Sequence, residues 1–127
     1  LVNLGFVFND PATTESNLFP YTTLFRSGRP ACTHYEVLQR GKNWTYIKLH
    51  PETGRTHQIR VHLASIHHPV IGDKLYGGKN PNSGTLKMER QALHARYLEL
   101  NHPFSGTQLS FSANLPFDME SFLQSQK

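Results

Sequence analysis

The stretch TGRTHQIRVHLASIHHPVIGDKLYGG runs from Thr53 to Gly78 and contains the central helical pattern of the sequence. Within it, apolar residues recur at the i, i+4, i+7 spacing of a helix: Ile59, Leu63 and Ile66. This spacing predicts an amphipathic helix that Pro69 ends and that the preceding polar loop could cap. Arg60 lies about 100° around that helix from Ile59. We therefore expect the Arg60 side chain at the margin of the buried face.

Alternating polar and apolar residues on both sides of this helix predict four strands. They are Thr33–Arg40, Trp44–Leu49, Ala92–Leu100 and Gln108–Ala113. Turn-forming residues join them in two pairs, which indicates two β-hairpins. Near the end of the chain, Asp118 is expected to cap a short helix with an apolar face. The pattern predicts an α+β fold with a mixed, mostly antiparallel sheet, one central helix and a short C-terminal helix.

The composition indicates one small basic domain. The 127 residues carry a formal net charge of +4, and the pI is about 9.4. A basic domain of this size often binds a polyanion such as nucleic acid. Cys32 is the one cysteine, which excludes an internal disulfide and fits a cytoplasmic protein. No stretch approaches the roughly 20 apolar residues of a membrane span, so no membrane partner is expected.

The segment before Gly28 follows a different pattern. Residues 9–27, NDPATTESNLFPYTTLFRS, have no period and no clear helix caps. Within it, LFPYTTLFRS (18–27) resembles the translation of a common short-read sequencing-library adapter. We therefore expect residues 1–27 to be non-native or disordered and residues 28–127 to form the domain. On this interpretation residues 1–8 have no reliable connection to the rest, and the alternative is a natural aromatic-rich arm.

Four further blocks accompany the central stretch. They are GRPACTHYEVL (28–38), RQALHA (90–95), HPFSG (102–106) and ANLPFDM (114–119). In order and spacing they resemble the RluA/RluD-type RNA pseudouridine synthases. The resemblance implies that residues 28–127 are the C-terminal part of a catalytic domain that isomerises uridine to pseudouridine in RNA, flipping the nucleotide into a pocket. The implied partner is ribosomal RNA, that of the large subunit first, with tRNA possible. No cofactor, metal or obligate protein partner is implied.

The resemblance also assigns roles to individual residues. In the family an aspartate begins the chemistry, a tyrosine stacks on the base, and a basic residue pairs with the aspartate. That basic residue maps to Arg60, while Arg55 and His57, near the helix start, are the expected RNA-binding residues. The aspartate and tyrosine belong to upstream motifs that do not occur before Gly28. We therefore expect this chain to be inactive alone, and the alternative is a non-catalytic RNA-binding remnant.

Three other features of the motif region lead to separate predictions. Asp73 is expected to stabilise a turn rather than to replace the missing aspartate. His67 stands where the family usually has glycine, so a left-handed helix end there would carry a small stability cost. His57 and His62 are five residues apart, roughly 140° around a helix, which disfavours a shared metal site. No metal is therefore expected.

Overall fold

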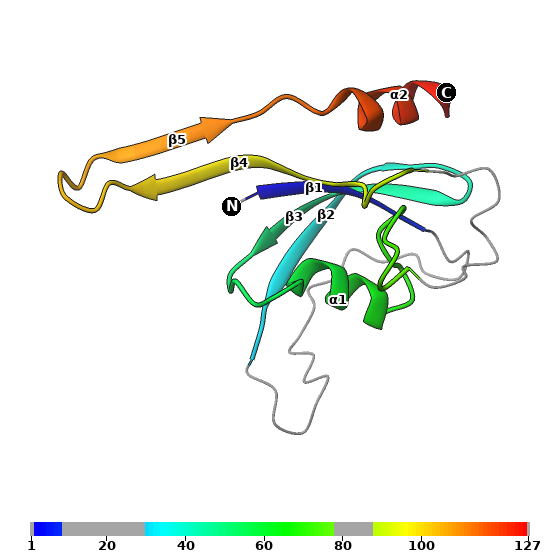
Figure 1. The fold of residues 1–127 in the computed structure, drawn as a ribbon, viewed down its shortest axis with the longest axis horizontal. Helices are drawn as coiled ribbons and strands as arrows, with labels where there is room; N and C mark the ends of the chain where they lie inside the picture. The colour runs from blue at the N-terminus through cyan, green and yellow to red at the C-terminus, as the bar shows by residue number, and fades with distance from the viewer. Residues whose placement is uncertain (1, 9–29, 78–87, 127) are drawn as a thin grey trace.

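The computed structural model describes residues 2–8, 30–77 and 88–126. Their elements form one five-stranded sheet and two helices (Figure 1). The elements are β1 (Val2–Phe8), β2 (Thr33–Arg40), β3 (Trp44–Pro51), α1 (Gln58–Ser65), β4 (Leu93–Asn101), β5 (Gln108–Ser112) and α2 (Phe117–Ser125). The strand order is β2-β3-β1-β4-β5, and every pairing among these described strands is antiparallel. The predicted α+β class and the two hairpins, β2–β3 and β4–β5, are confirmed.

Strand β1 occupies the centre of the sheet, which corrects the prediction for the start of the chain. It pairs with β3 from Asn3 opposite Leu49 to Phe8 opposite Trp44, and its other edge pairs with β4. Because β1 joins the two hairpins, it supplies hydrogen-bond partners that β3 and β4 would otherwise lack. The expectation that residues 2–8 stand apart from the domain is wrong. Residues 9–27 lie outside the described residues, and their non-native origin stays a prediction.

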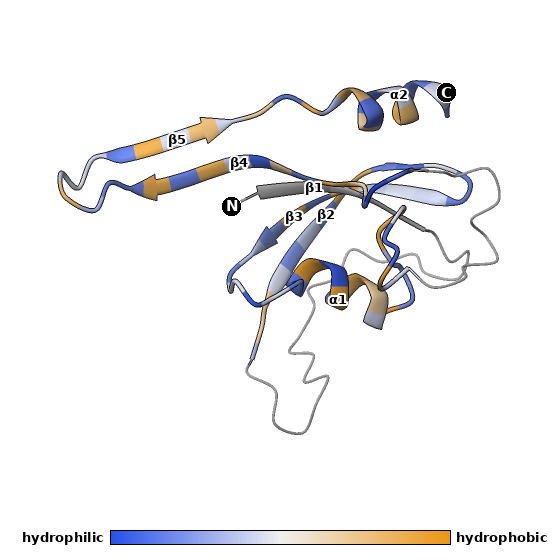
Figure 2. Cartoon of the chain, viewed as in Figure 1, coloured by the Kyte–Doolittle hydropathy of each residue, from blue (hydrophilic) through white to orange (hydrophobic). Residues whose placement is uncertain are grey.

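The core lies between α1 and the sheet and continues toward α2. Strand alternation turns Ile47 and Leu49 of β3 inward, and the predicted helix buries Ile59 and Leu63 against them. The fully or almost fully buried apolar residues are Trp44, Ile47, Leu49, Ile59, Leu63, Val70, Ile71, Ala92, Met119 and Phe122. The β4–β5 hairpin extends away from this core, with hydrophobic and hydrophilic residues alternating along it (Figure 2).

Helix α2 packs across the sheet through Met119 and Phe122, both buried, and the Phe122 ring meets Trp44 edge-on at 5.7 Å. The N-cap of α2 is Pro116, so the prediction that Asp118 caps this helix is wrong. Asp118 lies in the first turn, where its carboxylate pairs with Arg90 at 2.8 Å. A negative charge in a first turn is still favourable to the helix dipole. Within the described part of the chain, no helix is long and apolar enough to cross a membrane.

Candidate functional site

The loop that leads into α1 is held by the side chain of Gln58, the first residue of the helix. Its Oε1 accepts hydrogen bonds from the Thr53 hydroxyl at 2.7 Å and from the Arg55 backbone N–H at 3.1 Å. Its Nε2 donates to the Cys32 carbonyl and to the Thr33 hydroxyl, both at 2.9 Å. A primary amide has two donor hydrogens and two acceptor lone pairs, so this buried amide is fully satisfied. The loop is therefore fixed to the start of β2.

A second buried contact continues this network into the helix. The Thr33 hydroxyl, which accepts from Gln58, lies 2.9 Å from Nδ1 of His62. Because the hydroxyl has one hydrogen to donate, its donation to Nδ1 requires that nitrogen to be unprotonated. Burial lowers the pKa of His62, which agrees with a neutral ring. His62 is thus a buried core histidine.

His57 takes the N-cap position of α1 in a left-handed conformation, with φ 51° and ψ 24°. A side chain that caps a helix usually starts from an extended backbone. The left-handed backbone of His57 directs its side chain elsewhere, and no side chain caps α1, so the predicted capping by the polar loop is wrong. Instead, Nδ1 of His57 lies 3.1 Å from the hydroxyl of Tyr76, and the two rings meet edge-on.

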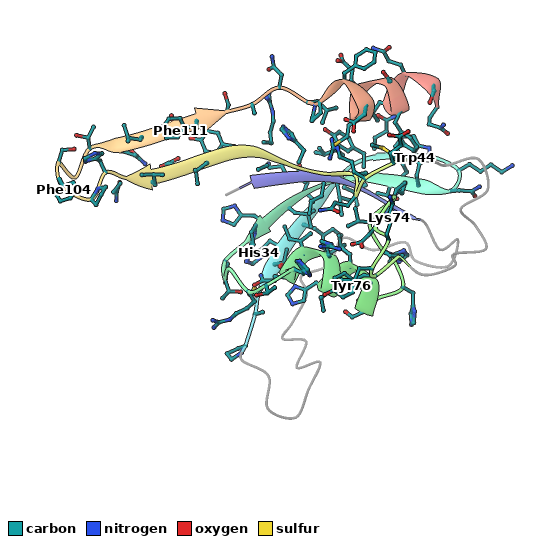
Figure 3. All side chains as sticks on the ribbon, in the orientation of Figure 1. His34, Trp44, Lys74, Tyr76, Phe104 and Phe111 are labelled. Carbon is teal, nitrogen blue, oxygen red and sulfur yellow. The ribbon has the colours of Figure 1, made fainter. Side chains whose placement is uncertain are left out.

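Arg60 lies between a carboxylate and an aromatic ring. Its Nε–H donates to Oδ2 of Asp73 at 2.7 Å, and an Nη2–H donates to Oδ1 at 2.9 Å. Its Cζ is 5.0 Å from the centre of the Tyr76 ring, which is labelled in Figure 3, and this is a cation–π distance. The Arg60 side chain is 13% exposed, as expected for the margin of the buried face, and that of Asp73 is fully buried.

Asp73 also performs the turn role that the sequence predicted. Its Oδ1 accepts backbone N–H bonds from Leu75 at 3.0 Å and Tyr76 at 3.1 Å. The Arg60 hydrogen bonds, followed by these backbone donors, hold the pKa of Asp73 at about 2 in spite of its burial. The Asp73 hydrogen bonds raise the pKa of Arg60. The pair is therefore ionised at neutral pH. Sequence reasoning missed the pairing, because contacts across a loop leave no periodic signal.

Exposed basic residues lie close to Arg60 and Asp73 in the sequence. Arg55 and His57 are exposed, and the Arg55 guanidinium makes no ion pair within the described residues. Lys74 is exposed between Asp73 and Tyr76 in the sequence. Arg90 differs from Arg55, because its guanidinium forms an ion pair with Asp118. Two other lysines of the expected basic region, Lys79 and Lys87, lie outside the described residues. The RNA-binding assignment of Arg55 and His57 stays a prediction.

Helix α1 ends in a left-handed residue, as the comparison of His67 with glycine predicted. His67 has φ 65°. Its N–H donates to the Ala64 carbonyl at 3.0 Å, and the next N–H, of His68, donates to the Leu63 carbonyl at 2.9 Å. This pair of bonds is a Schellman motif, in which glycine is the usual left-handed residue. The helix therefore ends at Ser65, before Pro69 could end it.

Comparison with known proteins bears on the identity of this site. The family model described as RNA pseudouridylate synthase matches residues 8–65. Ribosomal large subunit pseudouridine synthase D of Haemophilus ducreyi is 45% identical over 109 residues, 79% of this chain and 34% of the relative. Proteins of the same name from Nitrosomonas europaea and Escherichia coli (strain K12) are 50% and 40% identical, over 78% and 94% of this chain. This chain spans 30% and 40% of those two relatives.

Two solved structures share the fold. Human RNA Pseudouridylate Synthase Domain Containing 4 superimposes with a TM-score of 0.73 at 23% identity, over 97% of this chain and 60% of that structure. Human RNA Pseudouridylate Synthase Domain Containing 1 gives 0.72 at 21% identity, over 98% of this chain and 64% of that structure. The motif blocks, the matching family model and the bacterial relatives agree, and the chain therefore belongs to the RluA/RluD-type family of RNA pseudouridine synthases.

Proposed function

We propose that this chain carries the Arg60 side of the active site of an RNA pseudouridine synthase that acts on large-subunit ribosomal RNA in the cytoplasm. One observation carries the proposal: the Arg60 guanidinium is held between the buried Asp73 carboxylate and the Tyr76 ring. Such a cation is fixed in place without being buried completely. The names of the bacterial relatives support the choice of ribosomal RNA as substrate.

Arg60 would pair with a catalytic aspartate that lies outside this chain. A guanidinium has five N–H donors, and Asp73 uses two of them. The remaining N–H groups can serve a second carboxylate, which must stay ionised in a pocket poor in water. Asp73 would keep the guanidinium in one orientation for this purpose. The chain alone would then bind RNA without isomerising uridine.

Arg55 and His57 would contact RNA phosphates beside the start of α1. Both are exposed, and the N-terminal N–H groups of a helix favour a phosphate. Removal of one phosphate-binding charge should weaken binding and reduce its dependence on salt. Arg55→Gln should therefore lower the affinity for a large-subunit rRNA fragment several-fold, with a smaller salt slope. Lys42→Gln, an exposed substitution in the β2–β3 turn, is the matched control and should change neither quantity.

The enzyme assignment is tested by a chimaera in which residues 28–127 replace the matching segment of the Escherichia coli relative. We expect this chimaera to form pseudouridine in rRNA, and the isolated chain to form none. Arg60→Lys in the chimaera should reduce the rate about a hundredfold or more, because lysine cannot form the two-point pair with Asp73. Circular dichroism of each chimaera checks that it is folded.

The second candidate is an RNA-binding remnant without catalytic competence. The observation that favours it is that Arg60 already has a carboxylate partner within this chain, so its charge is balanced without a catalytic aspartate. A folded chimaera that binds rRNA but forms no pseudouridine would support this candidate and exclude the enzyme. An Arg60→Lys chimaera as active as the unsubstituted chimaera would remove the proposed role of Arg60.

A further inference from the structure

The outer face of the β2–β3 hairpin carries a row of polar side chains. Successive residues of a strand alternate between faces, and Thr33 and Leu49 are buried on the face toward the core. The opposite face therefore presents His34 of β2 and His50 of β3. It also presents Cys32, the residue before β2, and Glu52, the residue after β3. His34 lies opposite His50 in the register. The four side chains thus occupy one corner of the sheet.

Three of these side chains bring their ligand atoms together. The Cys32 sulfur is 3.7 Å from Nε2 of His34, and that nitrogen also contacts the Glu52 carboxylate. The three ligand atoms all lie within 4.8 Å of one another. Their backbones are tied as well, because the Glu52 N–H donates to the Cys32 carbonyl at 3.0 Å. The cluster is therefore built on paired backbone rather than on a loose loop.

We propose that Cys32, His34 and Glu52 form a binding site for a divalent transition-metal ion, with Zn²⁺ as the best fit. One sulfur, one nitrogen and one oxygen ligand suit an ion of intermediate softness. Zinc holds such ligands at about 2.0 to 2.3 Å in a tetrahedron. Side-chain rotations would therefore have to move Nε2 of His34 and the Glu52 carboxylate apart, so that the ion replaces their direct contact. The His34 ring is 6.5 Å from that of His50, which makes His50 the candidate for the fourth position, otherwise taken by water.

The accessibility of the cluster and the charge of Glu52 are compatible with this role. The His34 and Glu52 side chains are 35% and 55% exposed, so an ion can enter from solvent (Figure 3 labels His34). The His34 hydrogen bond lowers the pKa of Glu52, which keeps that carboxylate ionised. Desolvation, followed by the neighbouring Glu52, raises the pKa of the Cys32 thiol. This shift disfavours the thiolate in the metal-free chain, so Zn²⁺ would have to displace the thiol proton on binding.

Histidine spacing within one helix gave no reason to expect a metal. The proposed ligands come instead from the open end of the β2–β3 hairpin, where Cys32 just before β2 lies opposite Glu52 just after β3. The site is independent of the proposed isomerase reaction, for which the family resemblance implies no metal. Its place suggests a structural role, since Glu52 directly precedes Thr53, a member of the hydrogen-bonded loop before α1. An ion bound there would link that loop to the start of β2.

The test is a titration of the whole, untagged chain with ZnCl₂ in competition with a chromophoric chelator. Cys32→Ser, His34→Ala and Glu52→Gln should each weaken Zn²⁺ binding at least about tenfold, since even the loss of an outer-shell partner costs that much in many sites. Glu36→Gln is the matched control. It removes a carboxylate from the same face of β2, one that pairs with Lys48 outside the cluster, and should leave the affinity unchanged.

Cobalt distinguishes this site from adventitious binding to other histidines. Co²⁺ bound to the unsubstituted chain should show thiolate-to-metal charge-transfer absorption, and Cys32→Ser should abolish it while circular dichroism remains unchanged. Zn²⁺ should also raise the thermal midpoint of the unsubstituted chain but not of Cys32→Ser. Zinc affinity that is equal in the unsubstituted chain and Cys32→Ser, or cobalt binding without the charge-transfer band, would overturn the proposal. In that case His34 and Glu52 form only a surface ion pair.

Discussion

Arg60 and Asp73 form a two-point ion pair, with Nε 2.7 Å from Oδ2 and Nη2 2.9 Å from Oδ1. The same carboxylate holds the turn at Leu75 and Tyr76 through their backbone N–H groups. One buried side chain therefore sets both the orientation of the guanidinium and the course of the chain that carries the Tyr76 ring. The pair connects α1 to the loop after it, and its loss should disturb both.

Asp73→Asn should destabilise the chain by about 3 kcal/mol, because it leaves the mostly buried Arg60 cation without its counter-charge. The matched control is Asp118→Asn, which removes the same charge from an exposed pair whose side chains are 43% and 44% exposed. Exposed pairs contribute at most about 1 kcal/mol. Chemical denaturation of both variants measures the difference. Equal losses in the two variants would show that the Arg60–Asp73 pair contributes no more than a surface contact.

The depressed pKa of Asp73 predicts an acid-dependent loss of stability. Its pKa is about 2 in the folded chain and 3.8 in the unfolded reference. The folded state is therefore favoured fully above pH 3.8, and this contribution disappears as the pH falls through 2. The contribution is roughly 2 kcal/mol. The free energy of unfolding, measured in urea from about pH 5 down to about pH 2, should fall more steeply for the unsubstituted chain than for Asp73→Asn. If the free energy of unfolding fell equally with pH in both chains, the acid sensitivity would come from groups other than Asp73.

Much of the fold was predictable because it rests on local patterns. Alternation identified β2 through β5 to within two residues, and helical spacing identified α1. Strand β1 was missed for a different reason. Its sequence, VNLGFVF, is nearly continuous in apolar residues, which is typical of a strand buried on both faces. The adapter-like segment that follows argues against assigning residues 2–8 to the domain, although their pairing with β3 and β4 does not depend on that segment.

The candidate site was predictable only in part. The position of Arg60 on α1 followed from helical geometry, and the turn bonds of Asp73 followed from the local chemistry of aspartate. The contact between these two residues depends on the path of the chain after His67, which no period encodes. The same limit applies to Tyr76, which reaches both His57 and Arg60 from beyond that turn. Local rules thus placed Arg60 and Asp73 but not Tyr76, and tertiary packing brought the three side chains together.

His67→Gly should stabilise the chain by about 0.5 to 1 kcal/mol. His67 has φ 65°, a conformation in which the Cβ of an L-residue is crowded. Glycine removes that crowding, and its greater freedom in the unfolded state offsets part of the gain. His67→Ala keeps the Cβ and is the control, with no gain expected. Thermal unfolding compares the three chains, and a stabilised alanine variant would place the cost in the imidazole rather than in the backbone.

Gly72→Ala should be the most damaging of three matched glycine substitutions. Gly72 has φ 77°, and an added Cβ would lie 2.1 Å from the Arg90 carbonyl oxygen. Gly106 has φ 69° with nothing within 4 Å, so Gly106→Ala costs only the strain of a left-handed residue, about 1 kcal/mol. Gly54→Ala meets neither obstacle. The expected order of destabilisation is Gly72, Gly106, Gly54, measured by thermal unfolding. Equal effects at Gly72 and Gly106 would mean that the chain near Arg90 moves aside easily.

Gln58→Leu should destabilise the chain by about 2 to 3 kcal/mol and loosen the loop before α1. Leucine has a similar volume but makes none of the four hydrogen bonds of the buried amide. The loss of stability should be smaller than that of four unsatisfied hydrogen-bonding groups, because three of the four partners keep another hydrogen bond. The Cys32 carbonyl still accepts from Glu52, the Thr33 hydroxyl still contacts His62, and the Thr53 oxygen still accepts from the Cys32 N–H.

The Arg55 N–H is the fourth partner, and its exposed loop lets water replace the missing bond. Hydrogen exchange can show whether the substitution loosens only the loop before α1 or the whole domain. In Gln58→Leu, hydrogen exchange should quicken at Arg55 and its neighbours in the loop while the amides of β3 keep their protection. Gln39→Leu, an exposed substitution on β2, is the matched control for adding an apolar side chain. If exchange quickened equally along β3, the amide of Gln58 would support the whole domain rather than the loop that carries Arg55 and His57.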